Sequence, residues 1–334
     1  MVKSLRLVFL AGDRREGEAA RLLAHRGHRV VTCGCLLPAG DEWAVQDPLA
    51  AIQEADAVVG PALGTVGDGE ALFRPAPMPP VPVQAEWLSA SRPGTPWLIG
   101  RSGPWLQRAA TAAGLPLVLF GERDDYAWLN AVPTAEGAVA EASRLAGRTA
   151  WSGRALVVGF GRCGQVLAAR LLAWGAEVVC VARRPAARAE ARTMGARAAG
   201  VDAMVAEAQH CEFLFNTVPA PLVTRRVLAA LPPGAVVVDI ASHPGGTDFP
   251  AAEALGVPAR LVGGIPGRHF PATAGRILAD VVEAILGEPV MANAQGRAAT
   301  CPAPDGTPVP LAAADRRPAV GGPPVDGQMA QGEV

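Results

Sequence analysis

The residues with the clearest chemical meaning form a glycine-rich turn near the middle of the chain. This turn has the sequence Gly159-Phe160-Gly161-Arg162-Cys163-Gly164, between an apolar run that suits a strand and a segment that suits a helix. In such a turn the first glycine permits a tight bend, the second lets the backbone approach a pyrophosphate, and the third allows close packing of helix on strand. The N–H groups that begin the helix would receive the negative charge. The turn predicts a dinucleotide site, and a Rossmann-shaped domain that binds no nucleotide is the alternative.

The residues after the next predicted strand indicate which dinucleotide binds. A NAD site normally has an acidic residue there, which accepts hydrogen bonds from the ribose 2′-hydroxyl. This chain has Arg183 and Arg184 instead, and guanidinium groups suit the 2′-phosphate of NADP. The sequence therefore favours NADP over NAD, unless these arginines are solvated charges at the start of the following helix.

Two further polar segments follow strands of the same predicted domain. We expect the first to lie over the bound dinucleotide, and it consists of Asn216, Thr217, Val218 and Pro219. The second, residues 239–248, contains His243 and several glycines, and we expect it near the nicotinamide. His243 is a candidate proton carrier because histidine titrates near neutral pH. A simple turn is the alternative for this second segment.

The first half of the chain carries candidate groups for a substrate. Arg123 lies in an acidic segment, residues 122–125, directly after a predicted strand, and its guanidinium could hold a carboxylate. Glu136 lies near the start of a predicted helix and is a candidate general acid or base in a cleft between domains. The alternatives are that Arg123 pairs with its acidic neighbours and that Glu136 stabilises the helix N-terminus.

The elements that must position these residues alternate between strands and helices. Strands are predicted at 5–10, 29–33, 55–59, 96–99, 115–120, 155–158, 177–181, 213–217, 235–240 and 260–262. Helices are predicted at 16–24, 105–113, 134–145, 164–174, 186–194 and 274–286. Residues 73–93 are rich in proline and predict an irregular segment or a short β excursion. Unalternating apolar strands separated by helices are typical of a parallel sheet, so we predict an α/β protein with two Rossmann-like, doubly wound parallel-sheet domains separated by a cleft.

The domain junction is expected at a helix that Pro133 precedes and Gly147 ends, because these residues are typical start and stop signals. The predicted parts are an N-terminal Rossmann-like substrate and catalytic domain (1–132), an interdomain helix (133–150), an NADP-binding Rossmann domain (151–273), a C-terminal helix packing back toward the first domain (274–292) and a disordered tail (293–334). The tail is predicted from its proline and glycine content and its lack of apolar periodicity.

Composition excludes several classes of function. The chain has 334 residues, 50% of them hydrophobic, and a formal net charge of −1, which gives no overall field to attract a nucleic acid. Its apolar runs fall far short of the roughly 20 residues that a membrane helix needs. Six cysteines without paired C-x-x-C spacing indicate neither a disulfide framework nor a metal site. We expect a soluble, cytoplasmic protein that binds no metal.

A combination of motifs along most of the chain resembles the family of the dipicolinate synthase A subunit, the NAD(P)-binding dehydrogenase component of that enzyme. The motifs are Gly12-Asp13-Arg14, residues 122–125, Pro133-Thr134 with Glu136-Gly137, the turn 159–164, Ala241-Ser242, residues 244–249, Pro266-Gly267 and Thr273-Ala274-Gly275. Ala11 stands where the family pattern has a second glycine, and His243 where it has an arginine. The resemblance implies two Rossmann-like domains, NADP(H), and the last step to pyridine-2,6-dicarboxylate, the spore metabolite. It also implies a flavoprotein partner, the B subunit of dipicolinate synthase.

On this basis we expect an NADP-dependent oxidoreductase that converts 4-hydroxytetrahydrodipicolinate to dipicolinate. Glu136 or His243 is the expected proton acceptor, and Arg14 joins Arg123 as a carboxylate binder. The remaining candidate substrate-binding groups are Asn130, Thr134, Ser242 and Thr273. The alternatives are a D-2-hydroxyacid-type dehydrogenase and a nucleotide-binding scaffold without catalysis. The sequence leaves homo-oligomerisation open.

Overall fold

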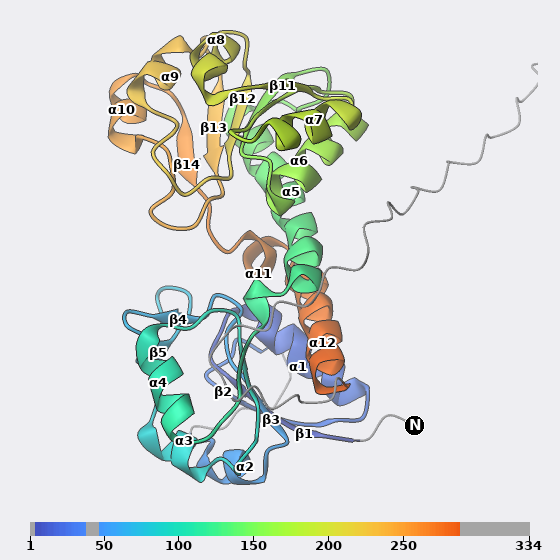
Figure 1. Cartoon of the computed structure of the whole chain (residues 1–334), viewed down its shortest axis with the longest axis vertical. Coiled ribbons are helices and arrows are strands. Elements are labelled where there is room, and N and C mark those ends of the chain that lie inside the picture. The colour runs from blue at the N-terminus through green and yellow to red at the C-terminus, as the bar shows by residue number, and fades with distance from the viewer. Residues whose placement is uncertain (1–3, 38–46, 288–334) are drawn as a thin grey trace, which may run out of the picture. The chain divides into compact units, whose positions relative to one another are not determined.

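The structure, a computed structural model, describes residues 4–37 and 47–287 (Figure 1). Its first half contains a five-stranded parallel sheet in the order β2-β1-β3-β7-β8. The strands are β1 (Arg6–Leu10), β2 (Arg29–Cys33), β3 (Ala57–Val59), β7 (Trp97–Ile99) and β8 (Leu117–Leu119). All pair in parallel, because each connection returns the chain to the same edge of the sheet.

Alternate residues of β1 enter two different hydrophobic cores, which explains why the strand is apolar throughout. Leu7 and Phe9 face the core formed with helices α1 (Arg14–His25) and α12 (Pro271–Gly287). Val8 faces the core on the other side of the sheet. The helices on that side are α2 (Leu49–Glu54), α3 (Ala85–Ala90) and α4 (Pro104–Ala112). The sheet is therefore covered by helices on both faces, as parallel sheets require.

Helix α12 comes from the end of the described chain, yet it packs along α1 and supplies Leu278 and Val282 to the first core. Gly275 makes this close crossing feasible. A Cβ added at Gly275 would collide with Glu18, so any larger side chain would push the two helices apart.

A small antiparallel sheet is inserted between β3 and β7. It consists of β4 (Thr65–Val66), β5 (Ala71–Leu72) and β6 (Val81–Pro82). The proline-rich segment thus contains β6 and α3 within otherwise irregular chain.

The second half contains a six-stranded parallel sheet in the order β11-β10-β9-β12-β13-β14. The strands are β9 (Arg154–Val158), β10 (Glu177–Val181), β11 (Arg197–Ala199), β12 (Phe213–Asn216), β13 (Val236–Asp239) and β14 (Ala259–Leu261). The strand order reverses between β9 and β12, which is the switch point where such sheets bind dinucleotides. The prediction of two Rossmann-like parallel sheets is confirmed.

Helices cover both faces of this sheet as well. One face packs against α6 (Arg162–Ala173) and α7 (Pro185–Thr193). The other face packs against α8 (Met204–Ala208), α9 (Arg225–Ala230) and α10 (Phe249–Ala254). The described elements also include two short 3-10 helices, Phe120–Glu122 and Val201–Ala203, and helix α11 (Ile265–His269).

Helix α5 (Asp124–Ala146) joins the two sheets, and its start differs from the prediction. The expectation that Pro133 precedes the helix is wrong, because Pro133 lies inside it. Asp124 and Asp125 occupy the first turn, where negative charge interacts favourably with the helix N-terminus. Pro133 has no N–H to donate to the preceding turn, and the hydroxyl of Thr134 donates to the Asn130 carbonyl beside it (2.7 Å).

Helix α5 ends where the sequence predicts, at Gly147. Gly147 adopts a left-handed conformation with φ of 66°, which lets its N–H bond back to the last turn. Early in the helix Tyr126 belongs to the core of the first sheet, whereas Ala135, Ala138, Val139 and Ala142 belong to the core of the second.

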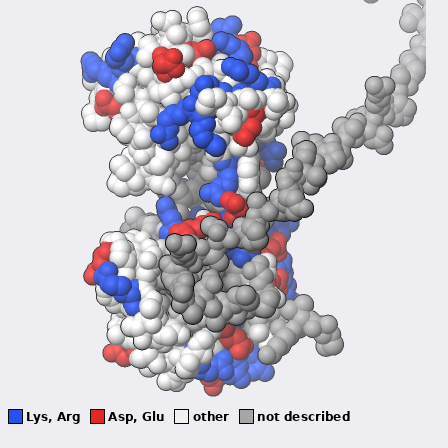
Figure 2. Space-filling view, in the orientation of Figure 1, with Lys and Arg blue, Asp and Glu red and all other residues white. Residues whose placement is uncertain are grey.

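Acidic and basic side chains are both spread over the face shown in Figure 2. Among residues 4–37 and 47–287, no helix is long and apolar enough to cross a membrane. The predicted disordered tail, 293–334, lies outside the described residues.

Candidate active site

The glycine turn between β9 and α6 has the geometry of a pyrophosphate cradle. Gly159 has φ of 96°, and a Cβ there would collide with the Thr217 hydroxyl. A Cβ at Gly164 would collide with the Gly159 carbonyl, so this glycine permits close packing of helix on strand. Gly161 differs, since its φ is −87° and a Cβ would meet no heavy atom within 4 Å. The protein itself needs no glycine at position 161, whereas a ligand that approaches the backbone there would.

The start of α6 also suits an anion. Gly161 is its N-cap residue, and no side chain caps the helix, so the first N–H groups have no side-chain acceptor and suit an anion. The Phe160 side chain is buried. Burial raises the pKa of the Cys163 thiol, so this side chain stays neutral. Arg162 forms an ion pair with Asp124 of α5.

Asn216 and Thr217 shape this edge of the sheet rather than present their polar groups outward. The Asn216 amide is fully buried and donates to the Val218 carbonyl (3.0 Å) and to Asp239 (2.9 Å). The Thr217 hydroxyl donates to the Val158 carbonyl (2.9 Å).

The buried Asp239 carboxylate fixes the loop after β13. It accepts hydrogen bonds from the N–H groups of Ala241 (3.0 Å) and Gly246 (2.8 Å) and from the Thr247 hydroxyl (2.7 Å). The two loops that follow β12 and β13 are therefore held together, with Val218 beside Gly159 and Pro219 exposed.

The two arginines after β10 are exposed. Within the described part of the chain, neither Arg183 nor Arg184 has a carboxylate at ion-pair distance. Arg188 holds their backbone in place by donating to the carbonyls of Ala182 (2.9 Å) and Arg183 (2.7 Å). Because β10 lies next to β9, these guanidinium groups are available to an anion at the same edge as the glycine turn.

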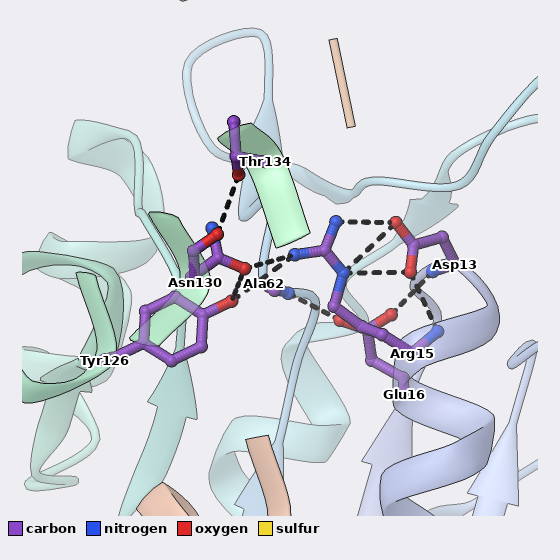
Figure 3. Close-up of polar contacts among 7 residues, drawn as sticks. All are labelled: Asp13, Arg15, Glu16, Ala62, Tyr126, Asn130 and Thr134. Atoms are coloured by element: carbon purple, nitrogen blue, oxygen red, sulfur yellow. Dashed lines mark hydrogen bonds and ion pairs between the residues drawn. The ribbon is translucent and has the colours of Figure 1, made fainter. Parts of the chain in front are cut away.

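A second polar centre is buried at the carboxyl end of β1, at the start of α1 (Figure 3). Glu16 accepts hydrogen bonds from the N–H groups of Asp13 and Ala62, both at 2.7 Å. The Asp13 carboxylate accepts from the Arg15 N–H (2.9 Å) and forms a two-point ion pair with the Arg15 guanidinium, at 3.0 Å from Nε and from Nη2. Asp13 and Glu16 thereby cap α1 and tie it to the loop after β3.

The remaining side of Arg15 faces α5. Its Nη1 lies 3.4 Å from the Tyr126 hydroxyl and 3.4 Å from Asn130 Oδ1, and Figure 3 shows these groups converging. Arg15 is only 2% exposed. Asn130, a predicted substrate-binding residue, therefore belongs to this polar cluster, and Thr134 donates to its backbone carbonyl.

Burial dominates the electrostatics of this cluster. Burial raises the pKa of the Glu16 carboxyl to about 8, and the nearby Asp13 carboxylate adds to the shift. Arg15 opposes it but does not outweigh it. Burial also raises the pKa of Tyr126. The buried setting therefore favours the protonated form of Glu16 more strongly than water does.

Arg14 is the arginine predicted for this position, but the buried guanidinium belongs to Arg15. Arg14 is exposed at the first position of α1. The signal that could have identified Arg15 is the spacing of Asp13 and Glu16, which is typical of a helix capping box and fixes which side of the first turn is buried.

Other predicted residues are engaged elsewhere. The Arg123 guanidinium pairs with Asp125 (Nη2 to Oδ2, 2.8 Å), which is the self-paired arrangement left open by the sequence. Glu136 pairs with Arg170 of α6 (3.1 Å), and its side chain is 40% exposed, so solvent reaches this carboxylate. The catalytic role of Glu136 stays a prediction.

The three remaining residues of the predicted site, Ser242, His243 and Thr273, are exposed or partly buried. His243 and Ser242 are exposed in the loop after β13, and Thr273 is half-buried in the first turn of α12. The Ser242 hydroxyl lies 3.4 Å from the guanidinium of Arg101, a residue that was not predicted from the sequence. Residues 4–37 and 47–287 contain no group of His, Cys, Asp and Glu side chains that could hold a metal ion.

Two parallel-sheet domains, one of which has a glycine turn suited to a pyrophosphate at its switch point, are typical of dehydrogenases that use a nicotinamide dinucleotide. In agreement, residues 129–243 match the D-isomer specific 2-hydroxyacid dehydrogenase, NAD binding domain. Residues 6–120 match the N-terminal domain of the dipicolinate synthase A subunit.

Whole-chain comparisons agree with the N-terminal match. The chain is 31% identical over 293 residues to the dipicolinate synthase A subunit of Bacillus subtilis (strain 168), covering 86% of this chain and 98% of that one. It therefore belongs to the dipicolinate synthase A subunit family. Its fold is similar to the crystal structures of this subunit from Bacillus halodurans (TM-score 0.76, 31% identity, 86% of this chain and 100% of that one) and from Bacillus subtilis (TM-score 0.74, 31% identity, 86% and 97%). The family and the dinucleotide domain together make this protein an oxidoreductase.

Proposed function

We propose that this chain is the NADP-dependent subunit of a dipicolinate synthase, which forms dipicolinate from 4-hydroxytetrahydrodipicolinate during spore formation. The observation that carries the proposal is the open space at Gly161, in a chain that belongs to this family. A glycine without a structural reason at the switch point supports a dinucleotide that reaches the backbone there.

The chemistry requires little covalent participation by the protein. Loss of the ring hydroxyl and a ring proton as water gives a dihydropyridine dicarboxylate, and loss of a hydride and a proton from this compound gives the aromatic product. The bound nicotinamide supplies the hydride acceptor. Aromatisation drives the reaction, so the protein must mainly orient the ring, hold two carboxylates and receive a proton.

The residues proposed for these tasks lie on segments at the carboxyl ends of the strands and on the linking helices. The proposed carboxylate and ring ligands remain Arg14, Arg123, Asn130, Thr134, Ser242 and Thr273, and the proposed proton acceptors remain Glu136 and His243. Of the two acceptors, His243 is better supported because it is exposed on a loop next to the dinucleotide edge, whereas Glu136 is paired with Arg170.

NADP is the proposed dinucleotide because of Arg183 and Arg184. Two exposed guanidinium groups beside the glycine turn, without carboxylate partners among the described residues, suit a 2′-phosphate. An acidic residue, which a NAD site would need for the ribose hydroxyl, is absent from residues 182–185.

A second protein is part of the proposal. The relatives are named as one lettered component of a synthase, and we propose that this chain likewise works with a further component, a flavoprotein. A D-2-hydroxyacid dehydrogenase is less well supported, because the match to that class covers only residues 129–243 and the N-terminal domain matches dipicolinate synthase instead.

The test is a reconstitution with the purified chain and its partner flavoprotein. The substrate is generated in place, NADP⁺ or NAD⁺ is added, and dipicolinate is measured by mass spectrometry. We expect dipicolinate only when both proteins are present, with one NADPH formed for each dipicolinate. Absence of dipicolinate with both proteins and both dinucleotides would refute the proposed reaction, and full activity of the single chain would refute the need for a partner.

A further inference from the structure

Arg101 occupies the carboxyl edge of the first sheet, directly after β7. This strand lies between β3 and β8, so its end is close to the centre of that edge. The Arg101 side chain is exposed. The carboxyl edge is the side of a parallel sheet on which such folds bind ligands.

The backbone that carries Arg101 is held firmly by the inserted antiparallel segment. The Arg101 carbonyl accepts a hydrogen bond from the Thr65 N–H (3.0 Å), and the Thr65 hydroxyl accepts one from the Gly103 N–H (2.8 Å). Gly64 lies so close that an added Cβ would collide with the Arg101 carbonyl. A guanidinium on a fixed backbone loses less freedom on binding a ligand than one on a loose loop.

The charge of Arg101 is not balanced locally. In residues 4–37 and 47–287 no carboxylate lies within ion-pair distance of its guanidinium. Other arginines of the same domain are paired, namely Arg6 with Glu54, Arg92 with Asp56, Arg108 with Asp68 and Arg123 with Asp125. Arg101 is thus an arginine of this edge whose charge is available to an anion.

The contact of Arg101 connects it to the dinucleotide domain. Its Nη1 lies 3.4 Å from the hydroxyl of Ser242, on the loop that Asp239 fixes at the carboxyl edge of β13. A ligand carboxylate could take the place of this long, exposed contact, because a charge-assisted hydrogen bond to a carboxylate is stronger than one to a hydroxyl.

We propose that Arg101 binds one carboxylate of the substrate, a ring that carries two carboxylates, and so selects dicarboxylates over monocarboxylates. This inference rests on the proposed function and adds to it the residue that sets the substrate class. Arg101 is better suited to this task than Arg123, because Nε and Nη2 of Arg123 are already engaged by Asp125. The planar fork of an arginine matches a carboxylate at two points, which a lysine would not.

The experiment measures binding of two probes to the chain in the presence of NADPH. The probes are pyridine-2,6-dicarboxylate and pyridine-2-carboxylate, titrated by calorimetry against wild type, Arg101→Gln and Arg101→Lys. Arg108→Gln is the matched control, because Arg108 follows in α4, is exposed and already has a carboxylate partner. Thermal melting of each variant checks that the fold is kept, and substitution of an exposed side chain should leave it nearly unchanged.

We expect Arg101→Gln to weaken binding of the dicarboxylate by about 10- to 100-fold, with a much smaller effect on the monocarboxylate. The affinity of Arg101→Lys for the dicarboxylate should lie between those of wild type and Arg101→Gln. Arg108→Gln should bind the dicarboxylate as tightly as wild type does. Equal dicarboxylate affinity in wild type and Arg101→Gln would overturn the role of Arg101 while leaving the proposed reaction intact. If wild type binds neither probe, the proposed substrate class fails and the role of Arg101 fails with it.

Discussion

Replacement of Gly161 by alanine separates the needs of the ligand from the needs of the fold. The added Cβ meets no heavy atom within 4 Å, and the backbone at this position is extended and open to any residue. The stability cost of alanine at a helix N-cap is offset by the lower entropy of the unfolded chain, so the free energy of unfolding should change by less than about 1 kcal/mol.

Dinucleotide binding should respond very differently. A pyrophosphate that lies against the Gly161 backbone must move away from the new methyl group, and such overpacking costs about 1–3 kcal/mol. Affinity for NADPH should therefore fall by about 5- to 150-fold. The measurements are a fluorescence titration with NADPH and a thermal melt followed by circular dichroism.

Two other glycines provide controls for this experiment. Gly164→Ala should lower the melting temperature, because its Cβ would collide with the Gly159 carbonyl. Gly263→Ala should change neither property, since Gly263 is exposed, a Cβ there would meet no heavy atom within 4 Å, and it follows β14, which lies three strands from the turn after β9. Unchanged NADPH affinity in Gly161→Ala would refute the assignment of this turn as the pyrophosphate cradle, and a melting temperature as low as that of Gly164→Ala would refute the steric reasoning.

Three other perturbations probe the dinucleotide preference, the buried Glu16 and the packing of α12. Replacement of both Arg183 and Arg184 by alanine should weaken NADPH binding about 10- to 1,000-fold and leave NADH binding nearly unchanged, as measured by calorimetry; equal affinity of wild type for both dinucleotides would contradict the NADP assignment. The fold raises the pKa of Glu16 from an ordinary 4.5 to about 8, so protonation of this carboxyl stabilises the folded state. This stabilisation is complete below about pH 4.5 and is lost as the pH rises through about 8. Thermal melts over this pH range should show that the melting temperature falls less with rising pH in Glu16→Gln than in wild type. Parallel curves for the two proteins would disprove the raised pKa of Glu16. Gly275→Val should lower the free energy of unfolding by about 1–3 kcal/mol in a urea titration, whereas the exposed control Ala272→Val should cost only a few tenths, and equal effects would argue against the close helix crossing.

Elements with strong local signals could be predicted from the sequence. The strands Arg29–Cys33 and Glu177–Val181 coincide with their predicted ranges, because each is a β-branched apolar run between a preceding glycine and a following turn. The strand Arg197–Ala199 and the helices Arg225–Ala230 and Phe249–Ala254 were not predicted, since they are too short to show a period.

The candidate site divides in the same way. The glycine turn is a local motif, so its geometry followed from its spacing. The cluster around Arg15 was missed because Tyr126 and Asn130 come from a helix more than a hundred residues away, and their approach depends on tertiary packing. Pro133 was misinterpreted because its usual effect as a helix boundary is overridden here by packing of the helix on both sheets.

The packing of α12 on α1 has a consequence for the order in which the protein forms during synthesis. The core of the first sheet contains Leu7 and Phe9 from the beginning of the chain, and Leu278 and Val282 from near the end of the described region. The ribosome must therefore release nearly the whole described chain before this core can close, although its sheet is made first. The strands of the second sheet, 154–261, are contiguous, and their domain can fold while α12 is still being made. Until then the exposed apolar face of the first sheet is open to misfolding or to a chaperone, so the half of the protein that is synthesised first is the half that is completed last.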